Sequence, residues 1–81
     1  MPRPYDRMPD DMRAVLDTIE SAGPAGILAR DICKKLEDVD SNTVQSIVSR
    51  LRYDGWIYRI YGTHPSVYRL NRPIPRGLRD G

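Results

Sequence analysis

The stretch that decides the fold is Ser41–Gly55, which reads SNTVQSIVSRLRYDG. Apolar residues recur in it at positions i, i+3, i+4 and i+7, the spacing of the buried stripe of an amphipathic helix. The opposite side of that helix carries small polar groups and a tyrosine, whereas exposed helical surfaces usually carry Glu and Lys. The stripe consists of Val44, Ile47, Val48 and Leu51, and the opposite side consists of Asn42, Ser46, Ser49 and Tyr53.

The polar side of this helix and its flanks are rich in groups that bond nucleic acids. Amides, hydroxyls and guanidinium groups form hydrogen bonds with base edges and phosphates. Further groups of this kind flank the polar side, namely Thr43, Gln45, Arg50 and Arg52. The pattern indicates a surface that contacts a polar, anionic partner. The alternatives are a surface that is only solvated and a surface that another protein covers.

The charge of the chain is divided unevenly between its two halves. Residues 1–40 hold six Lys and Arg against nine Asp and Glu, which gives −3; residues 41–81 hold seven Arg against two Asp, which gives +5, and these sum to the stated +2. All cations of the second half are Arg, which suits bidentate contacts with phosphate and guanine better than Lys does. The polar helix therefore lies in the basic half of the chain.

Length and composition narrow the class of protein. Eighty-one residues are enough for one domain with a modest core. With the single cysteine Cys33 and the single histidine His64, we expect no disulfide, no metal site and no catalytic constellation, and we expect neither enzyme activity nor a cofactor. The first residues lack the apolar core of a signal peptide, and no apolar run approaches the ~20 residues of a membrane span. We expect a cytoplasmic protein with no membrane partner and no small-molecule ligand.

Periodicity and turn residues predict an order of elements. We expect helices over Pro9–Ala22, over about Leu28–Leu36 and from Ser41 onward, the last capped by Ser41 or Asp40. Two strands follow, Trp56–Tyr61 and Val67–Leu70, joined by a loop over Gly62–Ser66, with a short extended piece around Gly26–Ile27. Residues 1–8 are expected as a loose arm, residues 9–71 as the domain and residues 72–81 as an extended or disordered tail. The fold class is α+β.

Four segments of this chain, in this order, resemble the winged helix-turn-helix DNA-binding family. They are Gly23–Ile32 (GPAGILARDI), Thr43–Leu51 (TVQSIVSRL), Asp54–Ile57 (DGWI) and Val67–Leu70 (VYRL). The resemblance covers about Pro9 to Asn71. It implies three helices followed by a two-stranded hairpin, the wing, with the third helix as the recognition helix. The chain departs from the family pattern in lacking a Ser or Thr cap before the second helix and in lacking Arg and Lys at the wing tip, which holds His64-Pro65.

The resemblance implies that the third helix enters the major groove of DNA while the wing strands contact the backbone. The residues expected at base edges are Asn42, Thr43, Gln45, Ser46 and Ser49. Those expected at phosphates are Arg50, Arg52, Tyr53, Arg59 and Arg69, with a guanine as a further target for Arg50 and Arg52. The expected function is sequence-specific binding of double-stranded DNA by a small stand-alone transcriptional regulator. It would be repressor-like or architectural, associated with the nucleoid, and of a type common in phages and mobile elements.

Two points stay open at this stage. A homodimer would raise specificity through paired half-sites, with the first helix and the tails as candidate interfaces. The alternative function is a protein-binding winged helix that serves as a complex subunit or as an inhibitor of a nucleic-acid-processing machine. In that case the acidic first helix, with Asp10, Asp11, Asp17 and Glu20, would carry more of the function.

Overall fold

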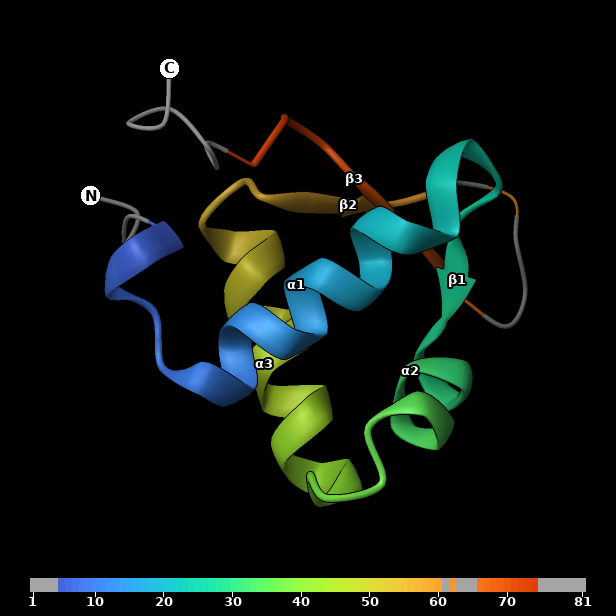
Figure 1. The fold of residues 1–81 in the computed structure, drawn as a ribbon. Coiled ribbons are helices and arrows are strands. Elements are labelled where there is room, and N and C mark those ends of the chain that lie inside the picture. Colours follow the sequence, from blue (N-terminus) through green and yellow to red (C-terminus); the bar gives the residue numbers. More distant parts are fainter. Residues whose placement is uncertain (1–4, 61, 63–65, 75–81) are drawn as a thin grey trace.

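The computed structural model describes residues 5–60, 62 and 66–74, and over these it contains three α-helices and a three-stranded antiparallel sheet (Figure 1). This confirms the α+β class. The elements in order are α1 (Asp10–Ala22), β1 (Ile27–Leu28), α2 (Ala29–Lys35), α3 (Ser41–Tyr53), β2 (Ile57–Arg59) and β3 (Val67–Leu70), with single 3₁₀ turns at Tyr5–Arg7 and Gly23–Ala25. In Figure 1 the strands β2 and β3 lie across the upper part of the molecule, and β1 runs down its right-hand side toward α2.

The helix α3 has the orientation that its sequence predicts. All four residues of its apolar stripe are buried, each at most 8% exposed: Val44, Ile47, Val48 and Leu51. Of the two expected caps, Asp40 is the one in place, because its carboxylate accepts a hydrogen bond of 3.0 Å from the backbone N–H of Asn42.

The other two helices end within one residue of their expected limits. Pro9 precedes α1 as its N-cap, and Asp10 and Asp11 occupy the first turn, where carboxylates are favourable beside the positive end of the helix dipole. The helix α2 follows Leu28 with no side-chain cap, as the sequence suggests. Its last turn holds Lys34 and Lys35, which are favourable at the negative end of the dipole.

The short extended piece expected near Gly26 is a strand, β1, and it joins the sheet. The strand order is β1-β3-β2, so the closing strand lies in the middle. Ile27 pairs with Tyr68, and Arg59 pairs with the same Tyr68 from the other side. Gly26 makes this pairing possible, since a Cβ there would lie 2.5 Å from Cγ1 of Val67 and 2.9 Å from the carbonyl oxygen of Tyr68.

The strand β2 is shorter than the expected Trp56–Tyr61. Trp56 precedes it and is buried in the core at 4% exposure, with the guanidinium of Arg72 stacked 4.0 Å from its ring centroid. Ile60 follows β2 and still donates its N–H to the carbonyl of Val67 at 2.9 Å. Tyr61, together with most of the expected hairpin loop, lies outside the described residues.

The packed part of the chain extends beyond the expected boundaries of residues 9 and 71. Met8 and Ile74 belong to the core, at 4% and 7% exposure. Tyr5 also packs against the core, and its hydroxyl donates a hydrogen bond of 2.8 Å to a carboxylate oxygen of Asp17 in α1. Single apolar residues between prolines show no periodicity, which is why the sequence pattern assigns these segments to an arm and a tail.

Candidate nucleic-acid interface

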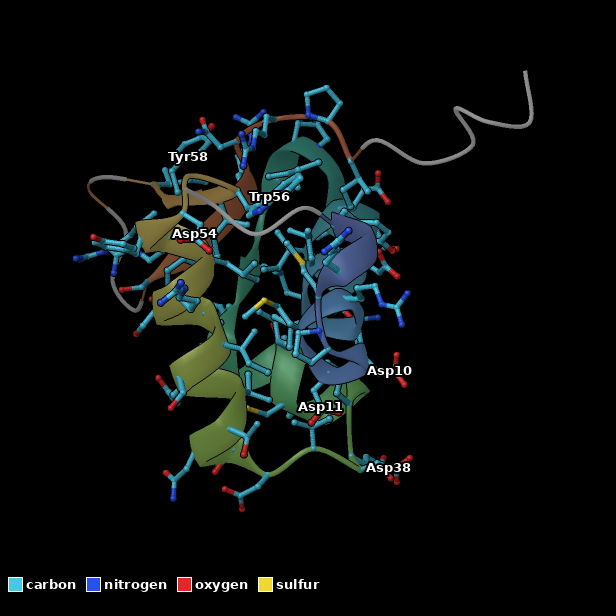
Figure 2. The ribbon with its side chains drawn as sticks, turned by 90° about the vertical axis from the view of Figure 1, so that its left-hand side faces the viewer. Asp10, Asp11, Asp38, Asp54, Trp56 and Tyr58 are labelled. Atoms are coloured by element: carbon cyan, nitrogen blue, oxygen red, sulfur yellow. The ribbon has the colours of Figure 1, made fainter. Side chains whose placement is uncertain are left out.

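The outer side of α3 forms an exposed polar surface at one side of the molecule (Figure 2). Seven of the residues expected to contact DNA are exposed on this helix, and Tyr53 stands out at 85% exposure: Asn42, Gln45, Ser46, Ser49, Arg50, Arg52 and Tyr53. The eighth, Thr43, lies at the flank of the helix and is half-buried. The helix contains no Asp or Glu. Its outer side therefore presents donors and acceptors without any negative charge.

The two arginines of α3 lie on opposite flanks of the helix, because a step of two residues turns the helix by about 200°. Arg50 donates from Nε to a carboxylate oxygen of Asp54 at 3.3 Å, and its guanidinium lies 5.9 Å from the ring centroid of Tyr53. The Asp54 side chain is 4% exposed, so this ion pair lies at the edge of the packed part of the domain. Arg50 is thus already paired within the domain.

Arg52 is directed toward the sheet and has a different environment. Its guanidinium lies 5.9 Å from the ring centroid of Tyr68 in β3. No carboxylate is within ion-pair distance of it among the residues that the structure describes. A cation held over an aromatic ring keeps its charge and its N–H donors available to an anion.

The two arginines of the strands lie on opposite faces of the sheet, although both were expected to contact the same backbone. Arg59 pairs with Tyr68, which pairs in turn with the buried Ile27, so these three share the face toward the helices. Arg69 pairs with Tyr58 on the other face, where its guanidinium lies 5.8 Å from the ring centroid of Tyr58. The structure therefore brings Arg59, but not Arg69, to the side of α3.

A cleft of about 380 Å³ lies between the C-terminal part of α3 and β2. Its lining consists of Arg52, Ile57, Tyr58 and Arg59. The Nε of Arg59 is buried and has no hydrogen-bond partner within the described part of the chain. Two arginines thus line one cleft, and among the described residues no acidic side chain lines it.

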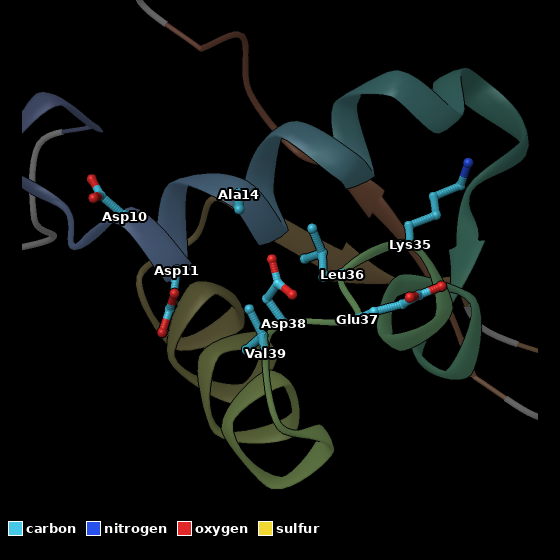
Figure 3. A pocket seen from close by; sticks show the side chains of 8 residues that line it. All are labelled: Asp10, Asp11, Ala14, Lys35, Leu36, Glu37, Asp38 and Val39. Atoms are coloured by element: carbon cyan, nitrogen blue, oxygen red, sulfur yellow. The ribbon is translucent and has the colours of Figure 1, made fainter.

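A second cleft, of about 450 Å³, has the opposite character and lies between the start of α1 and the turn from α2 to α3 (Figure 3). Four acidic side chains line it, together with Lys35, whose amino group points away from Asp10 and Asp11. The acidic residues are Asp10, Asp11, Glu37 and Asp38. Figure 2 shows Asp10 and Asp38 on the side of the molecule opposite to α3. The uneven charge of the sequence is therefore also uneven in space.

The described residues contain neither a candidate metal site nor a candidate membrane-spanning helix. No three His, Cys, Asp or Glu side chains in residues 5–60, 62 and 66–74 are grouped so that they could hold a metal ion. Over the same residues, no helix has both the length and the apolar character needed to cross a membrane. His64, at the expected wing tip, lies outside these residues.

Comparison with known proteins adds no relative: no protein-family model matches this chain, and neither does any curated protein or any solved structure. The candidate interface is characterised by its geometry alone. Two residues in it were not expected from the sequence, Tyr68 beneath Arg52 and Asp54 beside Arg50. The spacing of four between Arg50 and Asp54 is a signal for the second, since such pairs are neighbours on a helix. The position of Tyr68 follows only from the strand register.

Proposed function

We propose that this domain is a winged helix-turn-helix that binds double-stranded DNA, with α3 in the major groove, and that it acts as a small transcriptional regulator. The single observation that carries the proposal is the exposed face of α3, which is polar, free of carboxylates and continuous with the cleft that holds Arg52 and Arg59. Such a face matches base edges in the groove and phosphates beside it.

The order of elements supports the proposal. The three helices α1, α2 and α3 followed by the strands β2 and β3 stand in the order that the resemblance implies. The helices α2 and α3 are separated by only residues 36–40, and this turn is closed by a hydrogen bond of 3.0 Å from the N–H of Val39 to the carbonyl of Leu36. A short turn between two helices is characteristic of helix-turn-helix units.

The distribution of charge supports one direction of approach. DNA is strongly anionic, and its phosphates dominate binding affinity. The side with α3 carries Arg52, which has no acidic partner among the described residues, whereas the opposite side carries the acidic cleft at Asp10, Asp11 and Asp38. A duplex would be attracted to the first side and repelled by the second.

The deciding experiment selects bound sequences from a random duplex pool and then measures affinity for the selected duplex as a function of salt. Binding should weaken with a slope of log K against log salt of about −0.9 for each phosphate contacted. Ser46→Glu places a negative charge on the exposed face of α3, and we expect it to weaken binding about tenfold or more. Ser21→Glu is the matched control, because it adds the same charge to an exposed helical serine of α1.

Two results would contradict the proposal. One is the absence of binding to any duplex at low salt by a protein whose folding has been verified by its thermal melt. The other is an equal loss of affinity in Ser46→Glu and Ser21→Glu, since that would mean that net charge, and not the α3 face, governs binding.

The alternative function, binding to another protein, is favoured by the acidic cleft. A basic segment of a partner would meet four carboxylates there, of which Asp10 is ion-paired with Arg13. Replacing Asp11 and Asp38 by Asn would then abolish capture of the partner, while Ser46→Glu would leave it unchanged. The two functions therefore predict opposite effects of the same variants on binding.

A symmetric dimer through α1 has unfavourable electrostatics. The exposed first turn of that helix holds Asp10, which is ion-paired with Arg13, and Asp11, so a two-fold contact over this turn would bring two Asp11 carboxylates together. If the regulator acts on paired half-sites, we propose that its copies meet elsewhere. The spacing of half-sites in the selected duplexes measures this.

A further inference from the structure

The strand β2 forms one edge of the sheet, and among the described residues no further strand pairs with its outer side. The strand order β1-β3-β2 places β3 on its inner side. On that inner side, the N–H of Ile60 donates to the carbonyl of Val67 at 2.9 Å, and the N–H of Asn71 donates to the carbonyl of Trp56 at 2.8 Å. These two bonds fix which residues of β2 face β3.

The backbone groups of Ile57 and Arg59 point to the outer side. Bonded and non-bonded pairs alternate along an antiparallel ladder, so the pairs of Ile57 with Leu70 and of Arg59 with Tyr68 are the non-bonded ones. Neither residue makes a backbone hydrogen bond on the outer side within the described part of the chain. A row of unpaired N–H and C=O groups of this kind is a template for the addition of a further strand.

The cleft of about 380 Å³ lies along this same edge. Its lining includes all three residues of β2, together with Arg52 of α3. Successive residues of a strand point to opposite faces of a sheet, so a cleft that all three line lies at the edge and not over one face. An added strand would therefore lie in the cleft and meet the groups of Ile57 and Arg59.

The side chains around the cleft define the chemistry of such a strand. Arg52 and Arg59 line it, and no acidic side chain does so among the described residues. Tyr58 points to the other face of the sheet and is 37% exposed. Because directly opposite residues of paired strands share a face, an acidic residue suits the position opposite Arg59 and an apolar residue the position opposite Tyr58.

Three other occupants fit this edge less well. The phosphodiester backbone of DNA has no N–H donors, so it would leave the carbonyls of Ile57 and Arg59 unpaired. A second copy that paired β2 with itself about a two-fold axis would bring the arginines of the two clefts together. Residues 1–4 and 75–81 of this sequence hold three Arg against one Asp, and their prolines lack the N–H that a paired strand needs.

We propose that the open edge of β2 binds a short extended segment of a partner protein as an added antiparallel strand, in which acidic and apolar residues alternate. The acidic side chains lie on the face of Arg59 and Arg52, and the apolar ones lie beside Tyr58. This site goes beyond DNA binding and does not depend on it, since it gives the domain a protein partner at a different surface from the polar face of α3.

The test uses a seven-residue peptide of alternating Glu and Val with blocked ends, titrated into the whole chain labelled with ¹⁵N. We expect saturable shifts of the amide resonances of Ile57 and Arg59. In a bonded antiparallel pair the residue opposite Arg59 directs its own N–H to β2, and this residue is a Glu. N-methylation of the two central Glu residues should therefore weaken binding about tenfold or more, because it removes hydrogen bonds and places methyl groups against the edge.

Two controls separate strand addition from simple attraction of charge. N-methylation of two Val residues leaves the peptide charge unchanged and modifies only its outer edge, so it should change affinity by less than about twofold. In the protein, Arg52→Glu should weaken binding about tenfold, whereas Arg30→Glu, the same change at an exposed position of α2, should have little effect. The thermal melts of both variants are compared with that of the parent protein.

Each other result overturns the proposal. Equal losses from N-methylation at Glu and at Val would mean that the peptide binds by charge and not as a strand. Absence of saturable shifts at Ile57 and Arg59 would exclude this edge as the site, and duplex binding measured separately would stand unaffected. Shifts of these amides with protein concentration, together with a dimer in sedimentation, would assign the edge to a second copy; shifts with the selected duplex but not with the peptide would assign it to DNA.

Discussion

Replacing Gly26 by alanine tests the account of how the first strand reaches the sheet. Gly26 has φ +80° and ψ −178°, a backbone conformation that is essentially restricted to glycine. It also lies against β3, where an added Cβ would be 2.5 Å from Cγ1 of Val67 and 2.9 Å from the carbonyl oxygen of Tyr68. The side chain of Val67 can turn away, but the carbonyl belongs to the central strand and cannot move without shifting the sheet.

The expected cost has two parts. The backbone conformation contributes about 1–3 kcal/mol for any residue with a Cβ. The contact with β3 contributes about 1–3 kcal/mol more, as overpacking usually does. The total of about 2–6 kcal/mol is a large share of the roughly 4–12 kcal/mol by which a domain of this length is stable.

Gly23 provides a control with nearly the same backbone and no contact. Its φ is +72° and its ψ is −160°, and an added Cβ would have nothing within 4 Å. Gly23→Ala should therefore show only the backbone cost. Urea unfolding monitored by circular dichroism gives the free energy of unfolding of both variants, and the midpoint of Gly26→Ala should be clearly lower.

The reasoning is refuted if the two variants are equally stable. That result would mean that β3 accommodates a methyl group at residue 26, and that β1 does not approach it as closely as described. A Gly26→Ala protein that unfolds at the parent midpoint would also contradict the backbone part of the argument.

Three further substitutions test other parts of the fold by the same unfolding measurement. Val48→Asp puts an unpaired charge at a position that is 3% exposed and should lower the free energy of unfolding by about 3–5 kcal/mol. Ser49→Asp, on the exposed side, should lower it by less than about 1 kcal/mol. Equal stability of the two variants would mean that α3 is rotated from its described orientation. Asp40→Ala should cost about 1 kcal/mol through loss of the α3 cap, and Asp40→Asn should restore most of it; no effect of the alanine would exclude a capping role. Tyr5→Phe should cost about 0.5–1.5 kcal/mol because it removes the 2.8 Å hydrogen bond to Asp17, and an unchanged stability would show that the first segment is not fixed by this contact.

Elements with strong periodicity were predictable from the sequence, and α3 is the clearest case. Its apolar stripe is long enough to set the orientation of the helix, and Val44 and Leu51 are both fully buried as expected. A short extended piece was also expected around Gly26–Ile27, and the strand there covers Ile27–Leu28. Its pairing with β3 was not, since the partner of a two-residue strand depends on the tertiary structure.

The candidate site was predictable only in part, because the face of the sheet on which an arginine lies depends on the strand register. Arg59 and Arg69 look equivalent in the sequence, since each lies in a strand and each is next to a tyrosine. Which face each one occupies depends on how the strands pair, and a shift of one residue would exchange the faces. The pairing of Arg59 with Tyr68 places Arg59 beside α3 and Arg69 on the other face.

The central position of β3 has a consequence for how the chain matures. Chains are made from the N-terminus, and β1 and β2 both depend on Val67–Leu70 for their hydrogen bonds. While the ribosome has not yet reached residue 67, the helices can associate but these two strands have no partner. The pairing of residues 27 and 68 also spans a long stretch of chain, a kind of contact that slows folding. The surface formed by Arg52, Arg59 and Tyr68 therefore assembles only after the third strand has been made, and a nascent chain that stops before residue 67 would have the α3 sequence without this surface.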